Sequence, residues 1–262
     1  MRSHAQSGLP LGAVGRFLKI RAIANLFAVC CVIILGACEY TGRPDNALEK
    51  RFTWLSFLAG EDLKESCRNH APPRYRFVFN AIYSEQVRTY DINGLPDGGG
   101  GMFDAEVLSA KLSDSFLVHF PYWPWSGKRA IAQINDVEMS LLRNSLEASG
   151  FYKRPPVGKI LDSQSFYWAV SACEGNRFHF NAWSHPSPEF ANIRFVEILQ
   201  RFDGTKIALP EVRELSPEER EFRPRPAIAQ NDDHKGYFRF FAEVQQDGLR
   251  AAARADSIYS GS

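Results

Sequence analysis

Three histidines are the residues in this 262-residue chain best suited to acid–base or metal chemistry. His119, His179 and His185 carry imidazole groups, which titrate near neutral pH and can act as bases or ligands. None of them has a carboxylate or a cysteine at the spacing typical of a metal site. Histidines in such settings are mostly structural, so we expect no metal and no cofactor.

Carboxylates near an arginine form a second candidate group. Glu85, Arg88 and Asp91 lie within seven residues of one another. With the two-residue period of a strand, Glu85 and Asp91 share one face and Arg88 takes the other, which favours a solvated strand edge over a catalytic triad. The chain also lacks the G-x-S-x-G, S-x-x-K, H-E-x-x-H, C-x-x-C and P-loop motifs, which excludes the easily recognised enzyme classes that carry them.

An aromatic stretch is the most suggestive binding feature. Residues 120–125 read FPYWPW, so that Tyr122, Trp123 and Trp125 are separated by prolines that restrict the backbone. Flat aromatic rings stack on sugars and anchor protein contacts. The stretch therefore predicts a binding loop, and the alternative is that the two tryptophans cap one end of the core.

The N-terminal segment has the features of an export signal. Residues 22–37 contain sixteen uncharged positions, and basic residues precede them. The segment ends in LGAC over residues 35–38, which resembles the lipobox of bacterial lipoprotein precursors. The resemblance covers residues 1–38 only. The alternative is an uncleaved signal anchor, for which sixteen apolar residues are at the short limit of a membrane-spanning helix.

The resemblance implies a location as well as a modification. In that family the Cys38 thiol receives a diacylglycerol, the signal peptide is cut before Cys38, and the new amino group is acylated, with palmitate as the expected fatty acid. The lipid serves as a membrane anchor in the bacterial cell envelope. Because Glu39 rather than aspartate follows the cysteine, the resemblance further implies sorting to the outer membrane, facing the periplasm.

Cys67 and Cys173 remain once the signal peptide and the lipidated cysteine are set aside. An even pair in an oxidising compartment predicts one intramolecular disulfide, and two buried free thiols are the alternative.

The charge balance argues against nucleic acid as a partner. The chain has 31 basic and 30 acidic side chains, but residues 1–37 hold four of the basic ones and no acid. Residues 38–262 therefore have a net charge of −3 and offer no broad basic surface.

Local patterns predict the elements that must position these residues. Strands are expected over residues 75–83, 86–92, 103–111, 115–120, 165–173 and 177–184. Helices are expected from about residue 48 to Gly60, from the N-cap Asn135 to Gly150, and from Ser187 to about Phe202. The last two strands form a hairpin around Gly175-Asn176, a pair suited to a type II′ turn.

These elements predict an α+β domain with one mainly antiparallel sheet of about six strands and helices packed on a face. Four segments follow: a signal peptide (1–37), the lipidated cysteine and a tether (38–46), the domain (47–210) and a tail (211–262). Charge and proline dominate the start of that tail, so we expect it to be mobile, with one helix near residues 240–254.

Lipid tether, aromatic stretch and missing enzyme motifs together predict a non-enzymatic envelope lipoprotein that binds a partner protein or a cell-wall component such as peptidoglycan. One alternative is an envelope hydrolase or transferase whose site contains His119, His179 and Asp91. Another is a carrier or inhibitor with an aromatic pocket. Convergent histidine and carboxylate side chains would favour the enzyme, whereas a flat aromatic surface would favour binding.

Overall fold

The computed structural model describes residues 54–69, 71–83, 85–96, 98–109, 126–220 and 240–252. Along the chain, the helices and strands are α3 (Glu61–Arg68), β1 (Arg74–Ala81), β2 (Gln86–Gly94), β3 (Gly101–Ser109), β4 (Ser126–Ile134), α4 (Asp136–Ala148), β5 (Ile160–Asp162), β6 (Phe166–Glu174), β7 (Arg177–Ser184), α5 (Pro188–Ala191), α6 (Phe195–Phe202), α7 (Pro217–Arg220), β8 (Phe241–Gln245) and β9 (Gly248–Ala251).

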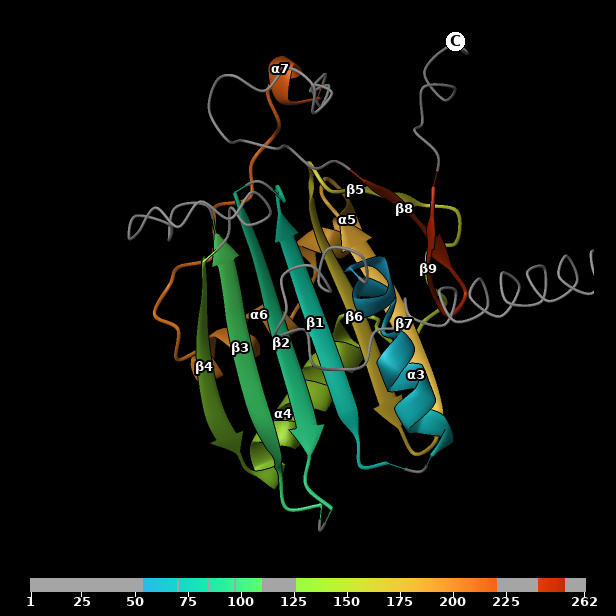
Figure 1. Ribbon diagram of the computed structural model, residues 1–262, viewed down its shortest axis with the longest axis vertical. Coiled ribbons are helices and arrows are strands. Elements are labelled where there is room, and N and C mark those ends of the chain that lie inside the picture. Colours follow the sequence, from blue (N-terminus) through green and yellow to red (C-terminus); the bar gives the residue numbers. More distant parts are fainter. Residues whose placement is uncertain are drawn as a thin grey trace, which may run out of the picture. The chain divides into compact units, whose positions relative to one another are not determined.

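The main sheet has six strands in the order β4-β3-β2-β1-β6-β7 (Figure 1). All five pairings in it are antiparallel. A second sheet of three strands has the order β5-β8-β9. The α+β class and the main antiparallel sheet of about six strands are therefore confirmed.

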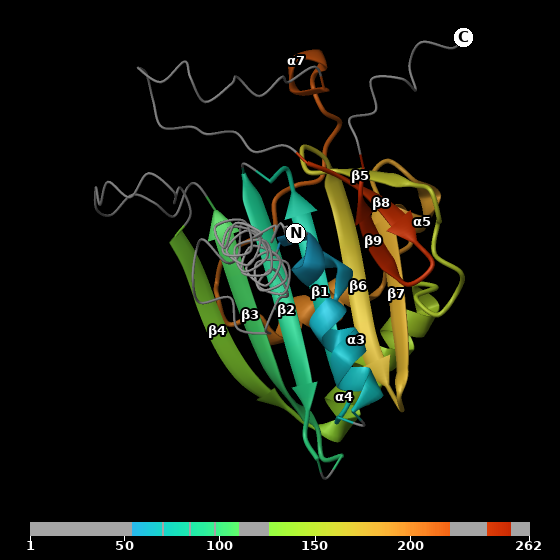
Figure 2. The ribbon, with the colours of Figure 1, turned by 45° about the vertical axis from the view of Figure 1, so that its right-hand side comes forward.

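Hydrophobic layers cover both faces of the main sheet. On one face, which we call the α4 face, Tyr75, Phe77 and Phe79 of β1 pack with side chains of α4 and α6. On the opposite face, which we call the α3 face, Val78 packs with the helical residues 54–59 and with the β5-β8-β9 sheet. Figure 2 shows that second sheet beside α3, over β6 and β7. The expected helical layer thus has a counterpart on the other side of the sheet.

β1 lies in the interior of the main sheet and is buried on both of its faces. Seven of its eight residues are buried, so both of its faces need a covering layer and both of its edges a partner strand. Tyr75, Phe77 and Phe79 share the α4 face, as the sequence predicts. Arg76 and Asn80 lie on the α3 face, and they are as deeply buried as the aromatic residues.

The local signals for α4 and for the β6–β7 hairpin are confirmed with one change. The Asn135 side chain accepts a hydrogen bond from the Glu138 amide, and the Glu138 side chain accepts one from the Asn135 amide, which is a complete capping box. In the hairpin, Gly175 has φ 52° and Asn176 has φ 67°. Two positive φ values are typical of a type I′ turn rather than the expected type II′ turn.

The helices differ from expectation in two places. The first expected helix does end at Gly60, whose φ is 71°, but α3, which was not expected, begins immediately after it. The helix expected from Ser187 is split, because the backbone leaves the α-helix at residues 192–194 between α5 and α6. The Ser187 side chain does cap α5 through the Phe190 amide, with proline in the first turn.

The end of the chain differs most from expectation. Residues 240–252 do not form a helix in a mobile tail. They contain the hairpin β8–β9, which pairs with β5 and buries Ala242 and Val244. Two buried residues two positions apart fix β8 on the domain, although the charged residues before it suggested an exposed tail.

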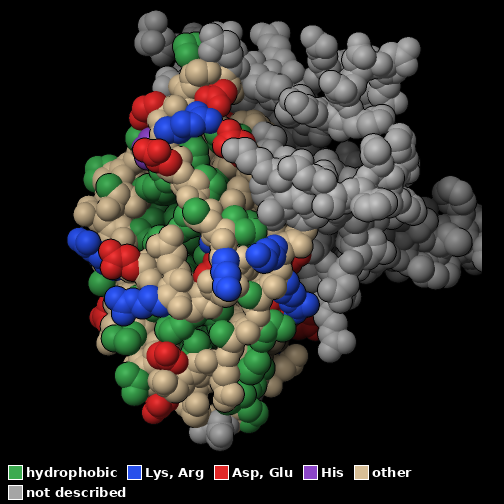
Figure 3. Space-filling view, turned by 90° about the vertical axis from the view of Figure 1, so that its left-hand side faces the viewer, with side chains coloured by type: hydrophobic (Ala, Val, Ile, Leu, Met, Phe, Trp, Pro, Cys, Tyr) green, Lys and Arg blue, Asp and Glu red, His purple; other side chains and the backbone are tan. Residues whose placement is uncertain are grey.

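β4 is a strand that was not expected from the sequence. Its composition, SGKRAIAQI, has no aromatic residue and only two β-branched ones, Ile131 and Ile134, so it carries little of the signal that marks a strand. It is held by nine register pairs with β3 at one end of the described sheet. Figure 3 shows that side of the molecule, where lysine and arginine side chains are interspersed with acidic and hydrophobic ones. The strand expected over 115–120 falls outside the described residues.

Candidate functional site

Several residues that the sequence singles out lie outside the described part of the chain: Cys38, His119, Tyr122, Trp123 and Trp125. The structure does place the two ends of the segment that carries the aromatic stretch. Ser109 at the end of β3 pairs directly with Ser126 at the start of β4. Residues 110–125 therefore connect neighbouring strands at the end of the sheet where β2 begins.

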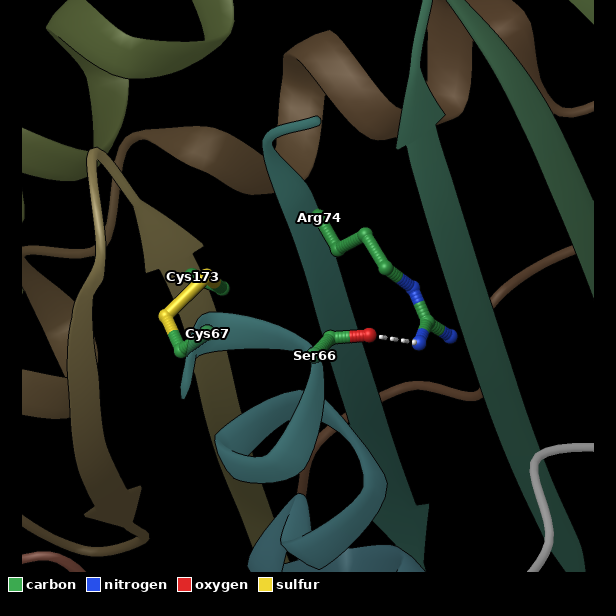
Figure 4. Close-up of a disulfide and its surroundings, with 4 residues drawn as sticks. All are labelled: Ser66, Cys67, Arg74 and Cys173. Atoms are coloured by element: carbon green, nitrogen blue, oxygen red, sulfur yellow. Dashed lines mark hydrogen bonds between the residues drawn. A yellow bond between two sulfur atoms is a disulfide. The ribbon is translucent and has the colours of Figure 1, made fainter. Parts of the chain in front are cut away.

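The expected disulfide is present and joins a helix to the sheet. Cys67 of α3 bonds Cys173 of β6 with an S–S distance of 2.01 Å and a Cα–Cα distance of 5.4 Å (Figure 4). Both cysteines are buried. Beside them the Arg74 guanidinium donates a hydrogen bond of 3.0 Å to the Ser66 hydroxyl (Figure 4). This cluster fastens α3 to β1 and β6 on the α3 face.

Asp91, a residue of the possible enzyme site, belongs to a buried ion-pair network. The Arg76 guanidinium, only 1% exposed, donates to Asp91 at 2.7 Å and to Asp62 of α3 at 2.6 Å. It also lies 3.9 Å from the centre of the Phe57 ring. A buried guanidinium needs such partners because an uncompensated charge in the interior is strongly destabilising. The Asp91 carboxylate therefore serves to hold Arg76.

His179 lies in a different environment, on the α4 face of β7. Its ring is 5.2 Å from that of Tyr152 at an interplanar angle of 89°, and 6.1 Å from that of Phe151. Burial lowers the pKa of His179, and the nearby Glu174 carboxylate partly opposes that shift. The imidazole is thus biased toward its neutral form.

The sheet keeps Asp91 and His179 apart. β1 and β6 lie between their strands, so three strand spacings, roughly 14 Å, separate them across the sheet. They also face opposite ways: Asp91 contacts Arg76 on the α3 face, whereas His179 contacts Tyr152 on the α4 face. These two residues of the possible hydrolase or transferase site cannot act on one substrate group together.

A cluster around Glu174 went unnoticed in the sequence. One oxygen of its carboxylate, Oε1, accepts hydrogen bonds from the Tyr75 hydroxyl at 2.5 Å and the Tyr152 hydroxyl at 3.1 Å. Burial, together with this carboxylate, raises the pKa of both phenols. Tyr75 and Glu174 are 99 positions apart, so no local spacing could reveal their contact.

The expectation of a solvated strand edge around β2 is wrong for Arg88, which is buried. It is 1% exposed and donates to the Asp203 carboxylate at 2.6 Å and to the Ile207 carbonyl at 2.6 Å. Tyr90 donates to the same carboxylate at 2.9 Å. β2 lies between β1 and β3, and its arginine fastens the chain that follows α6 to the sheet. Glu85, in contrast, is paired with Arg213 at 3.0 Å at the surface.

Across the described ranges no group of three histidine, cysteine or acidic residues is arranged to hold a metal ion. Nor does that part of the chain contain a helix long and apolar enough to cross a membrane. No known family model matches the chain. No curated protein matches it significantly either.

Proposed function

We propose that the protein is a lipid-anchored envelope protein that binds a partner protein or a cell-wall component and performs no chemistry of its own. In this proposal Cys38 carries the lipid, the α+β domain is held on the periplasmic side of the outer membrane, and residues 110–125 supply a binding loop. The LGAC sequence over residues 35–38 provides the support for the anchor.

The Cys67–Cys173 disulfide is the observation that carries the proposal. Disulfides persist in exported proteins and are rare in reducing compartments. This one fastens α3 onto the sheet, so the covalent link between them depends on an oxidising compartment. An exported domain with a cysteine at the end of a signal-like segment is what a lipoprotein precursor requires.

The geometry of the acid and base residues favours binding over the enzyme alternative. Asp91 is held by Arg76, and His179 lies on the opposite face of the sheet. The segment with Trp123 and Trp125, in contrast, leaves and rejoins the sheet at the paired residues Ser109 and Ser126. Two adjacent anchor points on a rigid sheet suit a loop that presents side chains to a partner.

Fractionation of cells tests the anchor. Wild-type protein should sediment with outer membranes and incorporate labelled palmitate. The variant Cys38→Ala should lose the label and either be released or accumulate as an uncut precursor, and Cys30→Ala, within the signal segment, is the matched control that should behave as wild type. Unchanged labelling and sedimentation of Cys38→Ala would refute the lipid anchor.

Paired Trp123→Ala and Trp125→Ala substitutions test the loop. If the rings contact a partner, loss of each tryptophan should weaken the free energy of binding to that partner by about 2 kcal/mol or more, while the melting temperature stays near wild type. If the tryptophans cap the core, the same variants should lose about 3–5 kcal/mol of folding free energy instead. Normal folding with unchanged capture would reject the binding loop.

A further inference from the structure

Glu174 has one carboxylate oxygen, Oε2, to which no other residue in the described part of the chain is bound. Tyr75, which is 1% exposed, and Tyr152 both donate to Oε1, so the carboxylate is fixed with Oε2 outside both hydrogen bonds. None of the ion pairs within the described ranges includes Glu174. A partly buried carboxylate of fixed orientation with one available oxygen is a prepared hydrogen-bond acceptor.

A rigid aromatic ring, that of Tyr152, lies next to this carboxylate. Tyr152 is 39% exposed, although its hydroxyl is bound to Glu174. Its ring meets Phe151 at 5.0 Å and His179 at 5.2 Å, with interplanar angles of 68° and 89°. Contacts on these sides and a bound hydroxyl keep the ring in one orientation, so its exposed surface can receive a ligand at little cost in side-chain entropy.

The charges around the cluster are of both signs. Arg177 lies opposite Glu174 in the β6–β7 register, and Arg143 of α4 acts on the Tyr75 and Tyr152 phenols. Both arginines are exposed. A cationic ligand would meet two guanidinium groups, and a simple anion would meet Glu174. Hydroxyl groups can donate to the carboxylate and accept from the guanidinium groups at the same time.

From this arrangement we infer that the Glu174 cluster binds a sugar ring of a glycan. Neighbouring hydroxyls donate to Glu174 Oε2, and the apolar C–H face of the ring stacks on Tyr152. Arg177 and Arg143 donate to further oxygens of the glycan. The inference rests on the proposed function, because the glycan that an envelope protein meets is the cell wall, and it places a second binding surface away from residues 110–125.

Calorimetric titration of the full-length protein in detergent tests this inference. The probe is a set of soluble peptidoglycan fragments released by a muramidase. Glu174→Gln removes the charge but keeps the shape, and should weaken binding about tenfold or more, as expected for a lost hydrogen bond to a charged group. The exposed residue Glu65 of α3, on the opposite face of the sheet, changed to Gln, is the control for net charge and should stay within about twofold of wild type.

Two substitutions of Tyr152 separate stacking from hydrogen bonding. Tyr152→Ala removes the ring and should weaken binding about tenfold, a loss comparable to that of Glu174→Gln. Tyr152→Phe keeps the ring and should lose less. Equal losses for the phenylalanine and alanine variants would overturn the stacking role. Thermal melting of each variant shows that the fold is retained.

Competition identifies the part of the fragment that is bound. Glycan strands from which an amidase has removed the stem peptides should compete, and free stem peptides should not. Competition by the peptides alone, or no binding of any fragment by the folded wild-type protein, would overturn the sugar site. The proposed function fails on different evidence, namely unaltered fractionation of Cys38→Ala and unaltered partner capture by the tryptophan variants.

Discussion

Replacing Gly60 by alanine tests how closely the chain crosses the sheet before α3. Gly60 has φ 71°, and a Cβ added there would lie 2.4 Å from the Ser171 hydroxyl oxygen and 2.6 Å from the Ser171 Cβ. The left-handed backbone alone costs a residue with a side chain about 1–2 kcal/mol. Forced displacement of a packed strand adds about 1–3 kcal/mol. We expect Gly60→Ala to lower the free energy of unfolding by roughly 2–5 kcal/mol.

Gly158 provides the matched control for this prediction. Its φ is 86°, but no atom lies within 4 Å of an added Cβ, so Gly158→Ala should cost only the backbone contribution of about 1–2 kcal/mol. Adding Ser171→Gly to Gly60→Ala should relieve the steric part and give a favourable coupling of about 1–3 kcal/mol. Urea unfolding of the wild type, Gly60→Ala, Gly158→Ala, Ser171→Gly and the double variant measures the five free energies of unfolding. A cost for Gly60→Ala no greater than that for Gly158→Ala would refute the close approach.

Four further predictions concern the stability of the folded domain. Changing both Cys67 and Cys173 to alanine should cost about 4–5 kcal/mol, because the bond closes a loop of 106 positions, and reduced wild type should match the variant in urea unfolding. Asp203→Ala should cost about 3–5 kcal/mol by leaving the buried Arg88 without its carboxylate, and a cost under about 1 kcal/mol would contradict that pairing. Burial lowers the pKa of His179 from 6.5, so protonation of this imidazole favours the unfolded chain. The free energy of unfolding should therefore be highest above about pH 6.5 and should fall as the pH drops below that value. His179→Gln should reduce this dependence on pH, which urea unfolding at several pH values measures. Ending the chain after residue 239 should lower stability by about 2 kcal/mol or more, since Val244 is fully buried, and an unchanged melting temperature would show that β8 adds nothing.

Local patterns account for the parts of the fold that the sequence predicts. The capping box of α4 needs only Asn135 and Glu138, and the β6–β7 hairpin needs only Gly175-Asn176 between two apolar runs. β1 is recognisable because its aromatic residues alternate over its whole length. Such signals act within a few residues, so they identify the elements but not the partners that cover them.

Contacts between distant residues explain what the sequence could not predict. Arg88 binds Asp203, which is 115 positions away in the sequence, and Glu174 binds Tyr75, which is 99 positions away. An arginine in a strand suggests exposure until its buried carboxylate is known, and a tyrosine gives no sign of which carboxylate it will bind. The Glu174 cluster therefore emerges only when β1, β6 and the chain after α4 are brought together.

β8 illustrates a different limit. Only Ala242 and Val244 are buried in it, and two apolar residues do not establish a two-residue period. The strand exists because its pairing with β5 and its packing on the α3 face supply what its own sequence lacks. Tertiary packing overrides weak local preference here, as it does for β4.

The intact mass of the protein purified from membranes tests the central claim most directly. We expect a chain that begins at Cys38, carries the diacylglycerol and a fatty acyl group, and lacks the two thiol hydrogens of Cys67 and Cys173 until a reductant restores them. A chain that still contains residues 1–37, or that begins elsewhere and bears no lipid, would contradict the proposal that this protein is a lipid-anchored envelope component.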